Sequence, residues 1–353
     1  MKIIHAADVH LGAKMDKFPK EIADKRKEEL RNTFRRMVEY ARTNQVRVII
    51  LAGDVFDSDT PFKRDKDFFY SVIKKTPEID FLYLKGNHDV AAAYSDEIIP
   101  NLKTFSSQWQ SYAYGNVVIS GIEISSENSA SMYSTLSLNA SDVNIVVLHG
   151  QAGDASGKDK VNLKKLCNKN IDYLALGHVH RHQNGKLDDR GVYAYSGCLE
   201  GRGFDETGKH GFILINIGEE IERAFVPFAE RTIIEADVDI TDAQDTYNAY
   251  LKVKEQINFE RKNIYRINLV GETDFDAEIL PSDVATYLGS DCLYADVKDK
   301  TVKKLDIKSF SGDLSLKGEF VRCAYANPEY SDEEKKKIIA IGLKALGGGN
   351  IEI

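Results

Sequence analysis

The sequence predicts an α/β fold with layered mixed β-sheets flanked by helices, followed by a small α+β domain. Continuous apolar runs alternate with amphipathic patterns in the longer N-terminal part, which is typical of strands whose two faces are covered. Hairpin-like runs after Gly191 indicate that the sheets are mixed. We expect a first domain at 1–229, an α+β capping domain at 230–300 and a C-terminal extension at 301–353 that ends in an amphipathic helix.

The strands expected in the first domain are short runs of β-branched and other apolar residues. They lie at 2–7, 46–53, 81–86, 116–124, 144–150, 172–178, 192–197, 211–217 and 222–228. A long charged helix is expected at 21–43, and an amphipathic helix at 64–75. The apolar stripe of the first helix is Ile22, Leu30, Phe34, Met37, Val38 and Ala41.

The part of the chain after residue 230 predicts strands and helices in alternation. Strands are expected at 231–240, 263–271 and 292–298, with helices at 242–259 and 281–290. From about residue 302 the chain is polar, and we expect it to be extended. A last helix begins at Ser331, which forms a capping box with Glu334, and ends at Gly347–Gly349.

Composition narrows the class of protein. The four cysteines are scattered without CxxC spacing, which is typical of reduced thiols in a cytoplasmic protein. No segment approaches the roughly 20 apolar residues of a membrane span, and the N-terminus lacks the features of a signal peptide. The formal net charge of −8 gives no indication of nucleic-acid binding. A local basic patch could still bind nucleic acid in a chain of this net charge.

Polar residues follow the expected strands at the point where each strand ends. Five of the eight histidines lie at these ends, among Asp8, His10, Asp54, Asp57, Asn87, His88, His149, His178 and His180. In an extended chain residues i and i+2 point to the same side, so His178 and His180 can face one spot. Ligand sites of open α/β sheets lie at such strand ends, so we expect these side chains to meet.

Carboxylate, amide and imidazole groups without thiolate favour manganese, magnesium, iron or zinc. There are too many candidate ligands for one ion, and two ions about 3.5–4 Å apart can share a bridging carboxylate. Such a pair can polarise a phosphoryl group and activate water for in-line attack. The sequence therefore predicts a two-metal centre that acts on phosphoesters.

The motifs "DVH", "GDVFD", "GNHD", "HG" and "GHVH", in this order, resemble those of the calcineurin-like metallophosphoesterase superfamily. The longer stretches "HAADVHLG", "VIILAGDVFD", "DYLALGHVHR" and "YSGCLEGRGFDE" are similar to those of the SbcD family of DNA repair exonucleases, the bacterial relatives of Mre-type nucleases. The resemblance covers about residues 1–230. It implies a metallophosphoesterase fold and cleavage of DNA phosphodiester bonds, by exonuclease or endonuclease action, in repair and recombination.

The resemblance also implies a role for each motif residue. One metal ion would be held by Asp8, His10 and His180, and the second by Asn87, His149 and His178. Asp54 would bridge the two ions, which would be Mn²⁺, with Mg²⁺, Fe²⁺ or Zn²⁺ as alternatives. His88 would be the general acid that protonates the leaving oxygen, and Asp57 would orient His88 or, alternatively, serve as a turn or cap residue. Asp89 is expected to form hydrogen bonds within its loop.

DNA contacts are expected from Lys14 and Arg181, and from basic residues of the first helix such as Arg26, unless these form a solvated helix face. The resemblance implies an SbcC-type coiled-coil ATPase as a partner, for which the last helix is either the docking site or a part of the capping domain. It also implies a homodimer formed through an N-terminal helical pair. The residues considered for that surface, or alternatively for the core, are Phe34, Met37, Val38 and Tyr40.

Two other functions share the same motifs. A metallophosphoesterase acting on small nucleotides or other phosphoesters would use every one of the candidate metal ligands. A non-catalytic scaffold would keep the fold without the chemistry, but the complete ligand set, with His88 present, argues against it.

Overall fold

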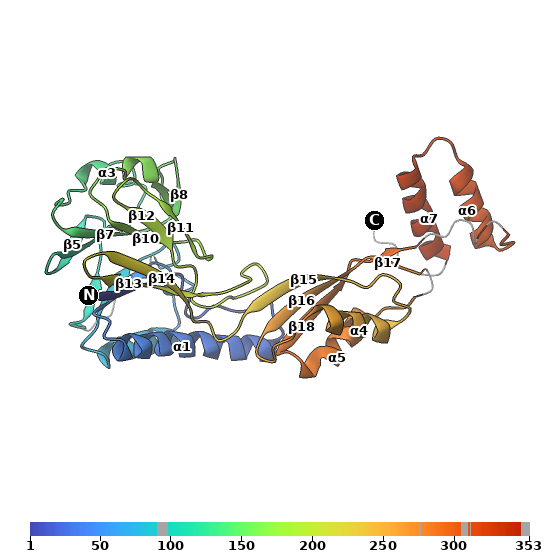
Figure 1. Cartoon of the computed structure of the whole chain (residues 1–353), viewed down its shortest axis with the longest axis horizontal. Helices are drawn as coiled ribbons and strands as arrows, with labels where there is room; N and C mark the ends of the chain where they lie inside the picture. Colours follow the sequence, from blue (N-terminus) through green and yellow to red (C-terminus); the bar gives the residue numbers. More distant parts are fainter. Residues whose placement is uncertain (90–97, 275–276, 305–309, 311, 347–353) are drawn as a thin grey trace. The chain divides into compact units, whose positions relative to one another are not determined.

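A computed structural model describes residues 1–89, 98–274, 277–304, 310 and 312–346. The chain forms two compact units, Met1–Ile234 and Glu235–Ile353. We expected the first boundary at 229/230 and a separate segment from 301. The first unit has two six-stranded sheets with helices outside them (Figure 1), which confirms the predicted α/β class.

The first sheet has the strand order β14-β13-β1-β2-β3-β4. Strands β1 to β4 are parallel, and β13 joins β1 in antiparallel orientation. The carboxyl ends of β1, β2 and β3 therefore lie at one edge of the sheet. The strands are β1 (Lys2–Ala6), β2 (Val48–Ala52), β3 (Asp80–Leu84), β4 (Leu102–Thr104), β13 (Gly211–Ile217) and β14 (Ile221–Pro227).

The second sheet has the strand order β11-β12-β10-β7-β6-β5. Its central strands β7 and β10 are parallel, and their register pairs His149 with Gly177. The ends of these two strands therefore lie side by side. The strands are β5 (Gln110–Tyr114), β6 (Val117–Gly121), β7 (Val143–His149), β10 (Tyr173–Gly177), β11 (Gln183–Lys186) and β12 (Val192–Tyr195).

The two sheets pack face to face and share one apolar core. Ile50 and Leu82 of the first sheet belong to the same buried cluster as Val147 and Ala175 of the second. The helix α1 (Lys20–Thr43) lies below the first sheet in the view of Figure 1. The helix α2 (Lys63–Lys74) contacts α1 through the rings of Phe34 and Phe69. The outer face of the second sheet is covered by a separate apolar cluster that includes the short helix α3 (Met132–Thr135).

The apolar stripe of α1 faces the protein interior. Phe34, Met37 and Val38 are buried, and the Phe34 ring centroid lies 5.6 Å from that of Phe69 in α2. For these three residues the alternative that they belong to the core is confirmed, whereas Tyr40 is only partly buried.

Several elements of the first unit were not predicted. They are the strands β4, β5, β11, β8 (Gln151–Gly153) and β9 (Lys160–Asn162), the 3-10 helix η1 (Leu163–Lys165) and the helix α3. All of these except β5 have only three or four residues. Three or four residues are too few to display a helical or strand period.

The unit Glu235–Ile353 contains a three-stranded sheet of order β15-β16-β18 and two helices. A two-stranded pair, β17 and β19, adds to it. The elements are β15 (Ile233–Asp239), α4 (Thr246–Gln256), β16 (Ile264–Val270), β17 (Glu272–Thr273), α5 (Pro281–Tyr287), η2 (Leu288–Ser290), β18 (Tyr294–Asp299) and β19 (Val302–Lys303).

This unit also contains a helical pair, α6 (Leu316–Ala326) and α7 (Asp332–Leu346). The prediction of an extended segment is wrong for α6, whose first turn is capped by the Ser315 side chain. Val321 of α6 packs with Ile339 and Leu343 of α7, so the pair forms its own small core.

The capping box that begins α7 is confirmed, because the Ser331 backbone N–H donates to Glu334 Oε2 at 2.8 Å. The glycines Gly347–Gly349 lie outside the described residues. In the part of the chain that the structure describes, no helix has the length and apolar character needed to cross a membrane.

Candidate metal centre

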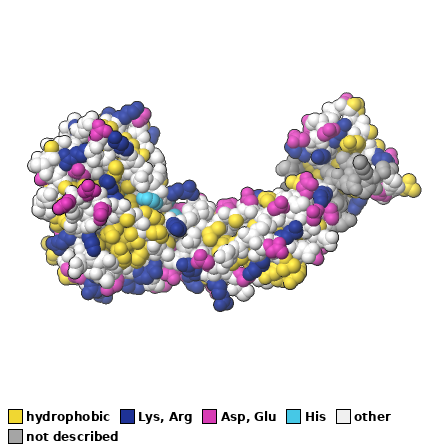
Figure 2. All heavy atoms as spheres, viewed as in Figure 1, with side chains coloured by type: hydrophobic (Ala, Val, Ile, Leu, Met, Phe, Trp, Pro, Cys, Tyr) yellow, Lys and Arg dark blue, Asp and Glu magenta, His cyan; other side chains and the backbone are white. Residues whose placement is uncertain are grey.

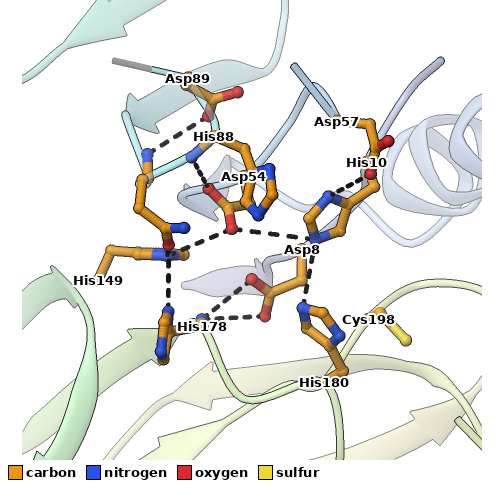
Figure 3. A network of polar contacts seen from close by, with 12 residues as sticks. Asp8, His10, Asp54, Asp57, His88, Asp89, His149, His178, His180 and Cys198 are labelled. Carbon is orange, nitrogen blue, oxygen red and sulfur yellow. Dashed lines mark hydrogen bonds and ion pairs between the residues drawn. The ribbon is translucent and has the colours of Figure 1, made fainter. Parts of the chain in front are cut away.

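The predicted ligands converge between the two sheets, where β1, β2 and β3 of the first sheet end opposite β7 and β10 of the second (Figure 3). Four of them have positive φ without being glycine: Asp8 (51°), His10 (51°), Asp54 (52°) and His178 (104°). This backbone region is unfavourable for residues with a Cβ, and such residues cluster at functional sites. The surrounding fold therefore holds these four residues in place against a local cost.

One group of candidate ligands consists of Asp8, His10 and His180, whose ligand atoms all lie within 4.8 Å of one another. The Nε2 atoms of His10 and His180 are 3.3 Å apart. Two imidazole nitrogens directed at one point are typical of residues that share a cation. The same three residues were predicted for the first metal ion.

A second group consists of Asp8, Asp54 and His149, again within 4.8 Å. Asp8 is common to both groups. Asp54 Oδ2 lies 3.4 Å from His149 Nε2 and 3.9 Å from His10 Nε2, so Asp54 lies between a histidine of each group. Asn87 Oδ1 lies 2.9 Å from His149 Nε2 and 3.1 Å from His178 Nδ1. The structure thus brings all seven predicted metal ligands together.

His149 is oriented by the backbone of a neighbouring strand. Its Nδ1–H donates to the carbonyl oxygen of Ala52 at 2.9 Å, which directs Nε2 toward Asp54. Burial alone would lower the pKa of His149, but the hydrogen bond and charge of Asp54 raise it to about 9. Burial likewise opposes ionisation of Asp54, yet His149 and His10 hold its pKa well below the ordinary value. In the absence of metal, the two groups therefore form an ion pair.

Two glycines make room for this arrangement. A Cβ at Gly53, which has φ +93°, would lie 2.1 Å from His149 Nδ1, and a Cβ at Gly86 would lie 2.1 Å from Asp54 Oδ1. Any side chain at these positions would displace a candidate ligand. The glycines of "GDVFD" and "GNHD" are thus part of the site.

His88 lies at the edge of the centre. Its backbone N–H donates to Asp54 Oδ1 at 2.9 Å, while its side chain is exposed. The ring centroids of His88 and His10 are 5.2 Å apart. His88 lines a cleft of about 780 Å³, so its imidazole is accessible to a bound substrate.

Asp57 has a different partner from the one expected. Its Oδ1 lies 3.1 Å from His10 Nδ1 and 3.0 Å from Arg202 Nη1. His88, the predicted partner, acts on Asp57 through its charge. The contact with His10 arises because the segments after β1 and β2 run side by side, with the Asp57 N–H donating to the Leu11 carbonyl at 3.1 Å. Asp57 therefore contacts the ring nitrogen of the candidate ligand His10 that faces away from His180.

His180 is held by two residues that the motifs did not single out. Its Nδ1 lies 2.8 Å from Glu206 Oε1 and 2.9 Å from Arg202 Nη2. Burial opposes ionisation of Glu206, but His180 and Arg202 hold the pKa of its carboxyl well below the ordinary value. Both residues belong to "YSGCLEGRGFDE", but a loop sequence does not reveal which side chain reaches a distant histidine.

Asp89 supports the loop, as expected. It is buried and accepts hydrogen bonds from the N–H groups of Val55 (3.0 Å) and Phe56 (2.9 Å). Burial is the main cause that raises its pKa to about 6. This side chain ties the loop after β3 to the loop after β2, and so fixes Asp54 relative to Asn87.

The three residues considered for DNA contacts differ in their exposure and in their position relative to the cleft. Lys14 is exposed and lines the same cleft as His88. Arg181 is exposed but does not line that cleft. Arg26 is fully buried and bonds to Glu29 and Glu200 at 2.6 and 2.7 Å, so the expectation that it contacts DNA is wrong.

Comparison with known proteins agrees with this geometry. The family model for calcineurin-like phosphoesterases matches residues 1–182. An uncharacterized metallophosphoesterase of Bacillus subtilis, YhaO, is 27% identical over 74% of this chain and 69% of its own length.

Two archaeal relatives carry the name DNA double-strand break repair protein Mre11. The protein of Methanosarcina acetivorans is 22% identical, and the match covers 95% of this chain but only 54% of that protein. The protein of Sulfolobus acidocaldarius is also 22% identical, over 97% of this chain and 94% of its own length. The superfamily and the similarity to Mre-type repair proteins are thus confirmed, and the chain belongs to the calcineurin-like phosphoesterase family.

Proposed function

We propose that this chain hydrolyses DNA phosphodiester bonds with the help of two divalent metal ions, as a repair exonuclease or endonuclease of the SbcD type. The observation that carries this proposal is the position of Asp54, which stands between two ligand groups and accepts a hydrogen bond from the backbone of His88. Similarity to proteins named for DNA double-strand break repair supports DNA as the substrate.

The donor set fits a pair of hard divalent ions. Oxygen and imidazole nitrogen atoms converge, and no thiolate is among them. We assign one ion to Asp8, His10 and His180, the other to Asn87, His149 and His178, and Asp54 to both. Mn²⁺ is the proposed metal, with Mg²⁺, Fe²⁺ or Zn²⁺ as alternatives. Such ions, when bound, supply Lewis-acid polarisation of the phosphoryl group and lower the pKa of water.

The remaining roles fall to residues around the ligands. His88, exposed in the cleft, would donate its proton to the leaving oxygen, which is the task of a general acid. Asp57 and Glu206 would orient His10 and His180 through their outer nitrogens, as carboxylates commonly do for ligand histidines. Lys14 would contact the DNA backbone from the cleft wall, and we retain Arg181 as a weaker candidate outside it.

The proposed partners are DNA, an SbcC-type coiled-coil ATPase and a second copy of the chain, in the cytoplasm. Exposed apolar residues on the α6–α7 pair, among them Leu316 and Ile341, support docking of the ATPase there. On the face seen in Figure 2, acidic and basic side chains are interspersed, which favours a DNA contact confined to the cleft over a broad basic surface.

Hydrolysis of small nucleotides or other phosphoesters is the second candidate function. It needs the same ligands, and it is favoured by the open cleft of about 780 Å³, a size typical of small-molecule sites.

The test compares end-labelled linear duplex DNA with bis-nitrophenyl phosphate, using the full chain with Mn²⁺, with a chelator, and with the His88→Ala variant. We expect degradation of DNA that requires both the metal and His88. Turnover of the small ester with intact DNA would instead favour the second candidate, and adding the ATPase partner would test whether cleavage depends on it. No turnover of either substrate, with two metals bound, would favour a scaffold.

A further inference from the structure

Phe62 is an exposed aromatic residue on the wall of the cleft that contains His88. Its exposed fraction is 72%, and the other strongly exposed aromatic side chains in the described part of the chain all lie after residue 234. A single exposed apolar residue is ordinary on a protein surface. The case for a role therefore depends on how Phe62 is held and what surrounds it.

The backbone of Phe62 is anchored although its side chain is exposed. Phe62 is the N-cap residue of α2, and its carbonyl accepts hydrogen bonds from the N–H groups of Asp65 (2.9 Å) and Lys66 (3.2 Å). Asp65 is itself buried and accepts from Arg31 at 2.9 Å. Helices favour Ser, Thr, Asp or Asn at the N-cap, and phenylalanine supplies no capping group. The start of α2 therefore gives no reason for an aromatic residue here.

The cleft around Phe62 combines an aromatic ring with charged side chains of both signs. Lys14, Lys17 and Arg202 line it, and so do five carboxylates, which are Asp16, Asp57, Asp59, Asp205 and Glu206. Arg202 is bound to Asp57 and Glu206, and Lys17 is paired with Asp205. Within the described ranges Lys14 forms no such ion pair, which leaves it available for a phosphate. Sites for single-stranded nucleic acid pair cations for the backbone with aromatic rings for the bases.

We propose that Phe62 is a stacking platform for one unpaired nucleobase near the scissile phosphate, so that the centre prefers single-stranded or frayed DNA to fully paired DNA. This inference rests on the proposed nuclease function. A base inside a duplex already has both faces covered by its neighbours, so it must leave the duplex to stack on Phe62. Because every base has an aromatic face, the contact gives little sequence preference.

The test uses the full chain with Mn²⁺ and single-stranded oligonucleotides in which one nucleotide at a time is replaced by an abasic tetrahydrofuran unit. We expect Phe62→Ala to lower kcat/KM about tenfold on the unmodified strand. The loss should vanish on the strand whose abasic unit lies opposite the ring, and Phe62→Trp should retain activity. Ile98→Ala is the matched control, since Ile98 is an exposed apolar residue that lines a different pocket.

Equal cleavage by the wild type and Phe62→Ala overturns the inference, and so does an equal loss on every abasic strand. If the wild type cleaves no oligonucleotide at all, the nuclease proposal fails instead. Binding of the same strands to His88→Ala protein, with and without Phe62→Ala, then decides the stacking role separately. A roughly tenfold weaker Kd that depends on one base would support it, and equal Kd values would overturn it.

Discussion

The two units of the chain differ in the kinds of polar residue that they bury. All eight histidines lie in Met1–Ile234. Among the described residues every buried charged side chain lies there too, including Asp8, Asp54 and Glu200, whereas Glu235–Ile353 buries only uncharged polar residues such as Asn268. Of nine described non-glycine residues with positive φ, Asp242 alone belongs to the second unit. Buried charged side chains and unfavourable backbone angles are thus concentrated in the unit that contains the candidate metal centre. The second unit has few residues of either kind among those described.

The largest expected effect concerns Asp54, the carboxylate that we propose to bridge the two metal ions. Asp54→Asn keeps the shape of the side chain but removes the charge between the two ligand groups. We expect phosphodiester hydrolysis to fall at least about a thousandfold, because metal ions contribute several kcal/mol to such a reaction. Steady-state kinetics on bis-nitrophenyl phosphate, with metal content by mass spectrometry, measures this. Asp189→Asn removes a fully exposed carboxylate and should leave the rate unchanged; near-normal turnover in Asp54→Asn would contradict the assignment.

The second prediction compares how much unfolding free energy is lost when one ion pair is broken in each unit. Glu200 in the first unit is fully buried and accepts from Arg26 Nη2 and Thr33 Oγ1, both at 2.7 Å. Asp296 in the second unit pairs with Arg266 at 2.8 Å and remains partly exposed. Removing one partner of a buried pair costs about 3–5 kcal/mol, against about 1 kcal/mol or less at the surface.

Urea unfolding of Glu200→Gln and Asp296→Asn, followed with a probe in each unit, measures the two losses. Similar losses in both variants would remove the contrast between the units.

Glu206 should influence metal affinity indirectly, because it contacts Nδ1 of His180 and not Nε2, which faces His10. We expect Glu206→Ala to weaken Mn²⁺ binding about 10–100-fold, the usual effect of losing a residue that orients a ligand histidine. Calorimetric titration of metal measures this loss. The neighbouring Asp205, which is exposed and paired with Lys17, provides the control Asp205→Asn. Unchanged affinity in Glu206→Ala would show that the protein holds His180 by other means.

The smallest effect concerns His5, which is buried away from the candidate ligands and lies 2.8 Å from Tyr173 Oη across the two sheets. Burial lowers its pKa from 6.5 to about 3. The unfolded chain takes up a proton as the pH falls below 6.5, and the folded chain does so only near 3. Folding stability is therefore lost as pH falls through this window, by about 1.4 kcal/mol per pH unit from this residue.

His5→Phe should remove this part of the slope in unfolding free energies measured between pH 7 and pH 5. Tyr173→Phe, which keeps the histidine, should preserve it. Equal slopes in His5→Phe and the wild type would mean that His5 is already charged in the folded protein.

The sequence predicted most of this fold because its long strands and helices repeat at clear periods. It also predicted which ligands meet, because these residues lie at the ends of strands. His149 is the last residue of β7, and Asp8, Asp54, Asn87 and His178 lie within three residues after a strand. It did not predict the partner of Asp57, because that depends on two loops lying side by side. Glu206 was missed for a similar reason: its contact with His180 joins residues 26 positions apart through a loop without a period. The helix α6 was missed because it is short and its polar residues are scattered, and its packing against α7 cannot be read from its own sequence.

The division of the ligands between two sheets has a consequence for how activity arises. Asp8, His10, Asp54 and Asn87 come from the first sheet, and His149, His178 and His180 from the second. While a nascent chain lacks β7 and β10, it holds only four of the seven candidate donors, even if its first strands have formed. A complete set of candidate donors therefore requires that the two sheets have docked, which joins distant parts of the chain. The hydrolase would in this way stay inactive until its two sheets have come together.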